Sequence, residues 1–253
     1  MSFITQKGAT GPLSLQAGGT FQQATDASLT TLVGTRYDLS DGREVIFVQA
    51  GATTISTAGL LCQDAAVVPN HQGLTTVSFT AYSSNGNVPA SAVVTLGNTA
   101  ATANQYAGGY ALIDSGPGIG QTLRIASNTA AAGSGTIAVV FEDGPNTALT
   151  TSSTVCLWPA HGAGVVVFPT TPTNAPVGVT LYPLTATYCG FLTSKGIAAV
   201  ASDATPASVG GEVAASTSVA GNTGAASGTG ATLIGTAAIL GVSGKSRAVF
   251  VNL

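Results

Sequence analysis

Residues 34–51 read GTRYDLSDGREVIFVQAG, and this stretch decides the fold class. The dipeptide Asp41–Gly42 lies between two runs of strand-forming residues. It is a strong signal for a two-residue β-hairpin turn, because glycine accepts the positive φ that such a turn needs. The same stretch holds a cluster of charged residues, namely Arg36, Asp38, Asp41, Arg43 and Glu44. We expect these charges to form salt bridges or an assembly contact, with a ligand site as the alternative.

The chain beyond residue 34 alternates with the period of two that is typical of half-buried β-strands. The apolar sets that share one face, and that we expect to be buried, are Val77, Phe79 and Ala81 in residues 75–83, Leu123 and Ile125 in residues 121–127, and Ile137, Val139 and Phe141 in residues 136–143. Further strands are expected at residues 155–158, 164–168, 177–183, 188–193, 197–201 and 247–253. No stretch of ten residues combines a helical period with a capping signal. The sequence therefore predicts an all-β fold of β-sandwich or jelly-roll-like barrel domains.

Composition suggests three regions along the chain. Residues 1–33 are rich in Gly, Gln, Thr and Ser, with few apolar residues, and we expect an extended N-terminal arm. Residues 34–168 form a first β-rich domain and residues 177–253 a second β-rich domain or subdomain. The irregular segment PTTPTNAP, residues 169–176, is the expected boundary. Residues 214–230 are low-complexity Gly, Ala, Ser and Thr, and they predict a long exposed loop or an extended interface ribbon.

Charge is scarce in this chain of 253 residues. Charged residues make up 7% of it, against roughly 25% in an ordinary soluble domain. The net charge is −3 and the isoelectric point about 5.1, and the seven Lys and Arg residues are mostly scattered singly. A nucleic-acid surface needs clustered cations, so we expect no nucleic-acid partner.

The mean hydropathy of +0.41 raises the question of a membrane. The most apolar runs, such as residues 163–168 and 197–201, are far shorter than the roughly 20 residues that a spanning helix needs. Residues 1–10 (MSFITQKGAT) have no apolar core of the kind that an export signal carries. We therefore expect neither a membrane partner nor export.

Two glycine-rich segments resemble phosphate-binding loops only in part. In residues 116–120 (GPGIG), position six of the dinucleotide motif is Gln121 instead of glycine, and a strand-like segment follows where a helix is required. Gly244-Lys245-Ser246 resembles the end of a P-loop, but the first glycine of that motif would fall at Ile239. We interpret both segments as turns and expect no cofactor.

Hydrolytic and metal chemistry also lack their signatures. No serine lies in a GxSxG elbow, and neither His71 nor His161 has an acidic residue nearby in sequence. The neighbours Glu142 and Asp143 would point to opposite faces of a strand. The three cysteines, which we interpret as buried free thiols, show no metal-ligand spacing and are Cys62, Cys156 and Cys189. We therefore expect no catalytic residues, no metal ligands and no enzymatic activity.

Three segments together resemble a group of structural proteins of tailed phages. They are GTRYDLSDGREVIFVQAG at residues 34–51, NQYAGGYALIDSGPGIGQTLRIAS at residues 104–127 and the terminal RAVFVNL at residues 247–253. The group is similar to capsid decoration, or cement, proteins: β-rich, often trimeric and bound to the outer shell at local three-fold positions. The resemblance carries no catalytic residues with it.

The resemblance implies a virion protein that is made in the host cytoplasm and binds the outer capsid surface. Its partners would be the major capsid protein and two further copies of itself in a homotrimer. A head-fibre, tail or receptor-binding component of the virion is the alternative, which clustered aromatic residues would favour. The major capsid subunit itself is disfavoured, because its fold needs a long spine helix that the sequence does not predict.

Overall fold

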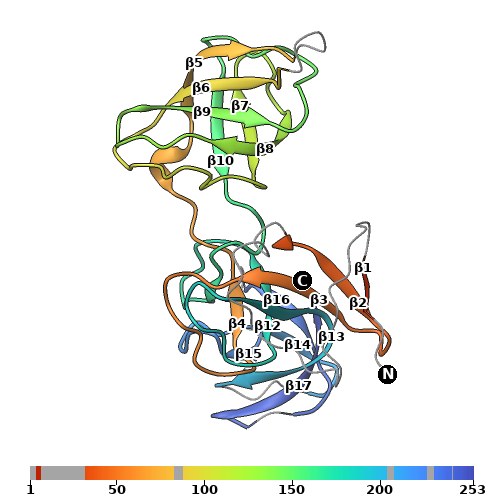
Figure 1. Cartoon of the computed structure of the whole chain (residues 1–253). Coiled ribbons are helices and arrows are strands. Elements are labelled where there is room, and N and C mark those ends of the chain that lie inside the picture. Colours follow the sequence, from red (N-terminus) through yellow and green to blue (C-terminus); the bar gives the residue numbers. More distant parts are fainter. Residues whose placement is uncertain (1–3, 7–31, 83–87, 204–207, 227–230, 241) are drawn as a thin grey trace. The chain divides into compact units, whose positions relative to one another are not determined.

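The computed structural model describes residues 4–6, 32–82, 88–203, 208–226, 231–240 and 242–253 (Figure 1). These residues form β-strands, turns and a short 3-10 turn at Pro69–His71, and they contain no α-helix. The predicted all-β class is thus confirmed. Among these residues there is no helix with the length and apolar character that crossing a membrane requires.

The chain divides into two compact units in a way that differs from the expected consecutive halves. Unit 1 combines residues 1–66 with residues 161–253, and unit 2 is residues 67–160, inserted between them. The expected boundary at residues 169–176 lies inside unit 1. This segment is not a boundary because strands on its two sides pair with the same strand. β4 (Leu61–Gln63) pairs with both β11 (Val166–Val167) and β12 (Pro176–Thr180), so hydrogen bonds join the two sides of residues 169–176.

Unit 2 is a closed six-stranded barrel in the order β10-β5-β6-β9-β8-β7 (Figure 1). Its strands are β5 (Leu74–Thr80), β6 (Ser91–Thr95), β7 (Tyr110–Ser115), β8 (Thr122–Asn128), β9 (Thr136–Phe141) and β10 (Thr154–Trp158). All the pairings are antiparallel. The barrel interior holds the two faces that alternation predicts for β8 and β9: Leu123, Ile125, Ile137, Val139 and Phe141.

The face predicted for β5 is wrong in part. Thr76 is buried and Phe79 packs against the barrel core, but Val77 is 48% exposed. Ala81, beyond the end of the strand, is exposed as well. The register between β5 and β6 shifts between Thr76 and Ser78, and a bulge of this kind breaks the strict alternation from which the face was inferred.

Unit 1 is one eleven-stranded sheet arranged around a long strand, β13 (Cys189–Ser202). Its other strands are β1 (Ile4–Gln6), β2 (Arg36–Leu39), β3 (Glu44–Gln49), β14 (Glu212–Ala215), β15 (Thr223–Ala225), β16 (Leu233–Ala237) and β17 (Lys245–Asn252), together with β4, β11 and β12. The first half of β13 pairs with β3 and β12. Its second half pairs with β17, from which pairings run through β16, β14 and β15 back to β13 at Ser202 and Thr223. This ring encloses its own apolar core.

Two expectations for unit 1 change. The strands predicted at residues 188–193 and 197–201 are one continuous strand, β13. The loop predicted over residues 214–230 contains the end of β14 and all of β15, while residues 227–230 lie outside the described residues. These strands contribute to the interior of unit 1, since Val213 and Thr223 are fully buried.

The predicted hairpin of residues 34–51 is present as β2 and β3. The Leu39 amide donates to the Arg43 carbonyl and the Gly42 amide to the Leu39 carbonyl. Three residues therefore form the loop, one more than predicted, and Gly42 occupies its left-handed position with φ +84°. Of the predicted arm, the structure describes only β1 and residues 32–33. β1 pairs with β2, and the remaining residues lie outside the described part of the chain.

Candidate interaction surface

The sequence segments that resemble phosphate loops are turns, as interpreted. Gly116, Gly118 and Gly120 all have positive φ between β7 and β8, and Gly244 has φ +76° directly before β17. Neither turn is followed by a helix in the described residues. Their glycines serve the backbone path of tight strand connections.

His71 lies in the interior of unit 2. Its Nε2 donates to the Thr99 carbonyl at 2.9 Å, and its Nδ1 accepts from the Tyr106 hydroxyl. Burial raises the pKa of Tyr106 to about 12, so the hydroxyl keeps its proton and can donate. Both ring nitrogens of His71 are thus occupied by structural hydrogen bonds.

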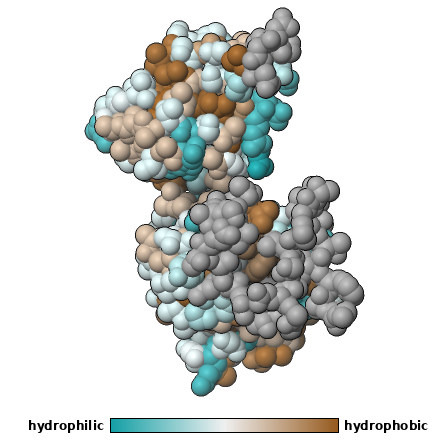
Figure 2. All heavy atoms as spheres, viewed as in Figure 1, coloured by the Kyte–Doolittle hydropathy of each residue, from teal (hydrophilic) through white to brown (hydrophobic). Residues whose placement is uncertain are grey.

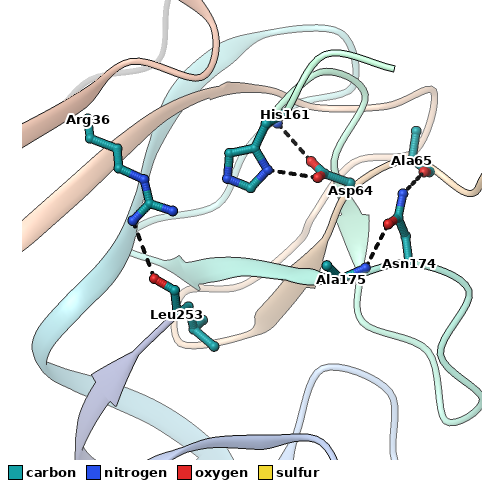
Figure 3. A network of polar contacts seen from close by, with 8 residues as sticks. Arg36, Asp64, Ala65, His161, Asn174, Ala175 and Leu253 are labelled. Atoms are coloured by element: carbon teal, nitrogen blue, oxygen red, sulfur yellow. Dashed lines mark hydrogen bonds and ion pairs between the residues drawn. The ribbon is translucent and has the colours of Figure 1, made fainter. Parts of the chain in front are cut away.

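His161 has an acidic partner that sequence reasoning missed, because the two residues are 97 positions apart. The buried carboxylate of Asp64 accepts from His161 Nδ1 at 2.8 Å and from the Gly162 backbone amide at 2.7 Å (Figure 3). Nearby, Asn174 donates to the Ala65 carbonyl at 2.6 Å. These bonds join the two segments of unit 1 that flank the inserted barrel in sequence, and they have the form of a structural network.

The charges of residues 34–51 form the expected ion pairs. Arg36 Nη1 lies 2.6 Å from Glu44 Oε1. It also donates to the Leu253 carbonyl at 3.3 Å (Figure 3). Arg43 lies 2.7 Å from Asp41, and its hydrogen bonds lower the pKa of the Asp41 carboxyl. The cluster thus stabilises the hairpin and one end of the chain.

Among the Lys and Arg residues that the structure describes, one is buried. Arg247 of β17 is 1% exposed, and its Nη2 donates to Thr223 Oγ1 at 3.2 Å. Burial lowers the pKa of this guanidinium, and the charge of Asp203 opposes that shift. Asp203 in turn accepts a hydrogen bond from the Ser216 hydroxyl. Arg247, Thr223 and Ser216 of this network are buried, whereas Asp203 is half-buried.

The described residues offer little for chemistry. No group of three or more His, Cys, Asp or Glu side chains among them could hold a metal ion. All three cysteines are free, and burial raises the pKa of the Cys62 thiol to about 12, which disfavours the thiolate needed for nucleophilic attack. Cys62 and Cys189 are buried as expected, whereas Cys156 is only half-buried.

The outer face of β13, β16 and β17 presents large apolar side chains to solvent. Ile197, Leu233 and Phe250 are 47%, 50% and 54% exposed, respectively, and Ile197 lies directly opposite Phe250 in the strand register. We call these three residues the apolar face. Three further exposed apolar residues follow on the connection from β16 to β17: Ile239, Leu240 and Val242.

An open hollow of about 520 Å³ adjoins the apolar face, and Leu233 and Phe250 line it together with Lys195 and Glu212. Gly235 also lines the hollow, and a Cβ there would lie 1.9 Å from the Phe250 carbonyl oxygen. A side chain at that position is therefore excluded while the two strands pair. The hollow combines an apolar base with one positive and one negative side chain.

The visible surface matches the charge-poor composition. Figure 2 shows strongly hydrophilic residues over only small parts of the described surface, with pale and hydrophobic residues over most of the remainder. Exposed apolar groups that gather on one face usually mark a contact with another molecule. The arrangement thus fits a binding surface better than a reaction site.

No protein-family model matches the chain, and no curated protein or solved structure matches it either. The structure describes an all-β protein of two compact units, one of which is a closed barrel.

Proposed function

We propose that this chain is a non-enzymatic structural protein of a tailed-phage virion, and specifically a capsid decoration (cement) protein. In this proposal it binds the major capsid protein on the outer capsid surface and stabilises the shell. It is made in the host cytoplasm, and it acts as a homotrimer because decoration at a three-fold position must match that symmetry.

The apolar face is the observation that carries the proposal. Fully burying a large apolar side chain contributes about 1.5–3 kcal/mol, and because these three are about half exposed, covering each contributes about half of that. Ile197, Leu233 and Phe250 lie on paired neighbouring strands, so one flat protein surface can cover all three at once. The strands hold these side chains in place before binding, which lowers the entropy cost of association.

Two further features support the assignment to an outer shell surface. The net charge of −3 and the scattered cations suit a surface that does not touch the genome. In addition, His71 is buried with both ring nitrogens hydrogen-bonded, and burial raises the pKa of the Cys62 thiol to about 12. A binding role explains why the apolar face is exposed, since a partner would cover it.

The test is co-sedimentation with undecorated capsids, using a surface variant and a matched control. Phe250→Ser removes an exposed side chain from the apolar face, and Val77→Ser removes one of similar exposure from unit 2. The proposal predicts that Phe250→Ser lowers the affinity for capsids by roughly tenfold or more, since every 1.4 kcal/mol is a factor of ten. Val77→Ser should bind capsids with near-normal affinity. Equal binding by both variants would remove the apolar face from the mechanism. Wild-type protein that ignores capsids but binds tails or host envelopes would instead support the head-fibre, tail or receptor-binding alternative.

A further inference from the structure

The outer edge of β2 is built to receive an extended segment. Thr35 accepts from the Phe47 amide and Leu39 donates to the Arg43 carbonyl, so these odd-numbered residues direct their backbone groups toward β3. Backbone groups alternate in direction along an antiparallel pair. Arg36 and Asp38 therefore direct theirs to the opposite side, where β1 lies, and without β1 this edge is a template for another strand.

The edge keeps its shape through contacts on its own side. Tyr37 and Leu39 are buried, and the Arg36 side chain is held by Glu44 and the Leu253 carbonyl. The pairing with β3 and the contacts of Arg36 with Glu44 and Leu253 thus hold β2 extended for a segment that pairs with its outer edge.

β1 is short and its connection to β2 is long. In the described part of the arm, Ile4, Thr5 and Gln6 pair with Leu39, Asp38 and Tyr37 in that order. Two to five residues are enough to join neighbouring antiparallel strands, but residues 7–31 lie between β1 and the first described residue before β2. A chain of that length can span up to about 80–90 Å. Its length therefore does not require β1 to pair with the β2 of its own chain.

We propose that in the assembled protein β1 of one copy pairs with β2 of a second copy, in the register Thr5 opposite Asp38. The backbone hydrogen bonds are the same within a chain and between chains, so exchange sacrifices none of them. Whether β2 pairs with the β1 of its own chain or of a second copy depends on the effective concentration of each β1 near β2. The effective concentration of the second copy's β1 rises once the copies are held together. Main-chain pairing supplies affinity in such strand addition. This inference concerns copies of the chain alone and does not depend on capsid binding.

Cysteine cross-linking in the absence of capsids tests the exchange. Thr5 and Asp38 are directly opposed, with a Cα separation of about 5.5 Å for a hydrogen-bonded pair, inside the range that a disulfide bridges. Thr5→Cys protein is mixed with Asp38→Cys protein that carries a mass tag, both in a Cys156→Ser background that removes the half-buried thiol. After mild oxidation, the products are separated by mass and the linked peptides identified by mass spectrometry. Tagged Asp143→Cys protein, whose cysteine is exposed in unit 2, replaces Asp38→Cys as the collision control.

We expect several-fold more mixed dimer from Thr5→Cys with Asp38→Cys than from the collision control, with residue 5 of one chain linked to residue 38 of the other. The Thr5→Cys/Asp38→Cys double variant, diluted until collisions are rare, tests whether the strands pair within a chain. An internal disulfide there, with no mixed dimer above the control, would show pairing within the chain only and would overturn the proposal. Absence of both products would overturn it as well, because the β1–β2 pairing itself would then be missing.

Discussion

Removing the Asp64 carboxylate is expected to destabilise unit 1 strongly. Asp64 is 2% exposed, and its carboxylate oxygens accept from the Gly162 amide at 2.7 Å and from His161 at 2.8 Å. A hydrogen bond to a charged group contributes about 1.5–3 kcal/mol, and a buried donor left without a partner costs about 1–3 kcal/mol. These effects overlap, so we expect Asp64→Ala to lower the free energy of unfolding by about 2–4 kcal/mol.

Asp64→Asn removes the negative charge of the carboxylate but keeps the shape of the side chain, so it separates the effects of these two properties on stability. Its amide oxygen can still accept from Gly162, and its NH₂ group can donate to His161 after the imidazole changes tautomer. We therefore expect a smaller loss, about 1–2 kcal/mol, since neutral hydrogen bonds are weaker than charged ones. Asp143→Ala removes an exposed carboxylate from unit 2 and is expected to stay within about 0.5 kcal/mol of wild type.

The assay is urea unfolding followed by two probes. Trp158, the single tryptophan, lies in unit 2 and reports on the barrel by fluorescence, while far-ultraviolet circular dichroism reports on both units. The Asp64→Ala loss should appear in the dichroism transition. An unchanged midpoint in Asp64→Ala, or equal losses in Asp64→Ala and Asp64→Asn, would refute the reasoning.

Three further predictions concern the hairpin, the arm and alkaline pH. Gly42→Val should lower the free energy of unfolding by about 1–3 kcal/mol, because φ is +84° there while no atom lies near the new Cβ; Gly42→Asn, which tolerates this φ, should lose much less, and equal urea midpoints would contradict a backbone origin. Deletion of residues 2–33 should leave the β-body folded by circular dichroism but weaken capsid co-sedimentation and particle heat resistance; undiminished binding would exclude the arm. Burial raises the pKa of the Cys62 thiol from 9.0 in the unfolded chain to about 12 in the folded protein. The stability that the neutral thiol contributes is therefore complete below pH 9 and is lost as the pH rises from 9 to 12. Urea titrations at pH 8 and 10.5 should show a smaller decrease in the free energy of unfolding between these pH values for Cys62→Ala than for wild type.

Local sequence pattern was sufficient for the hairpin and for strands such as β8, β9 and β17, whereas β4, β6 and β16 were not predicted. Ile137, Val139 and Phe141 alternate with less buried positions, and the barrel buries all three. The Asp41–Gly42 signal placed the hairpin correctly because the positive φ of a turn depends on the residue at that position. The exposure of Phe250 was within reach of the same logic, since Val249 and Val251 alternate with it and point inward.

Long-range pairing accounts for what the sequence could not predict. The insertion of unit 2 depends on β4 pairing with β11 and β12 across about 100 intervening residues, and no local period encodes such a choice. The Asp64–His161 contact follows from that same closure. The exposure of Val77 reflects a bulge, a single extra residue that alternation cannot anticipate.

A reconstruction of the virion from electron micrographs at side-chain resolution would show whether this chain decorates the capsid. The account predicts density for the two β-units on the outer capsid surface at local three-fold positions, with Phe250 and Ile197 covered by the major capsid protein. Density for this chain only in the tail or fibres, or a capsid that contains none of it, would contradict the decoration role.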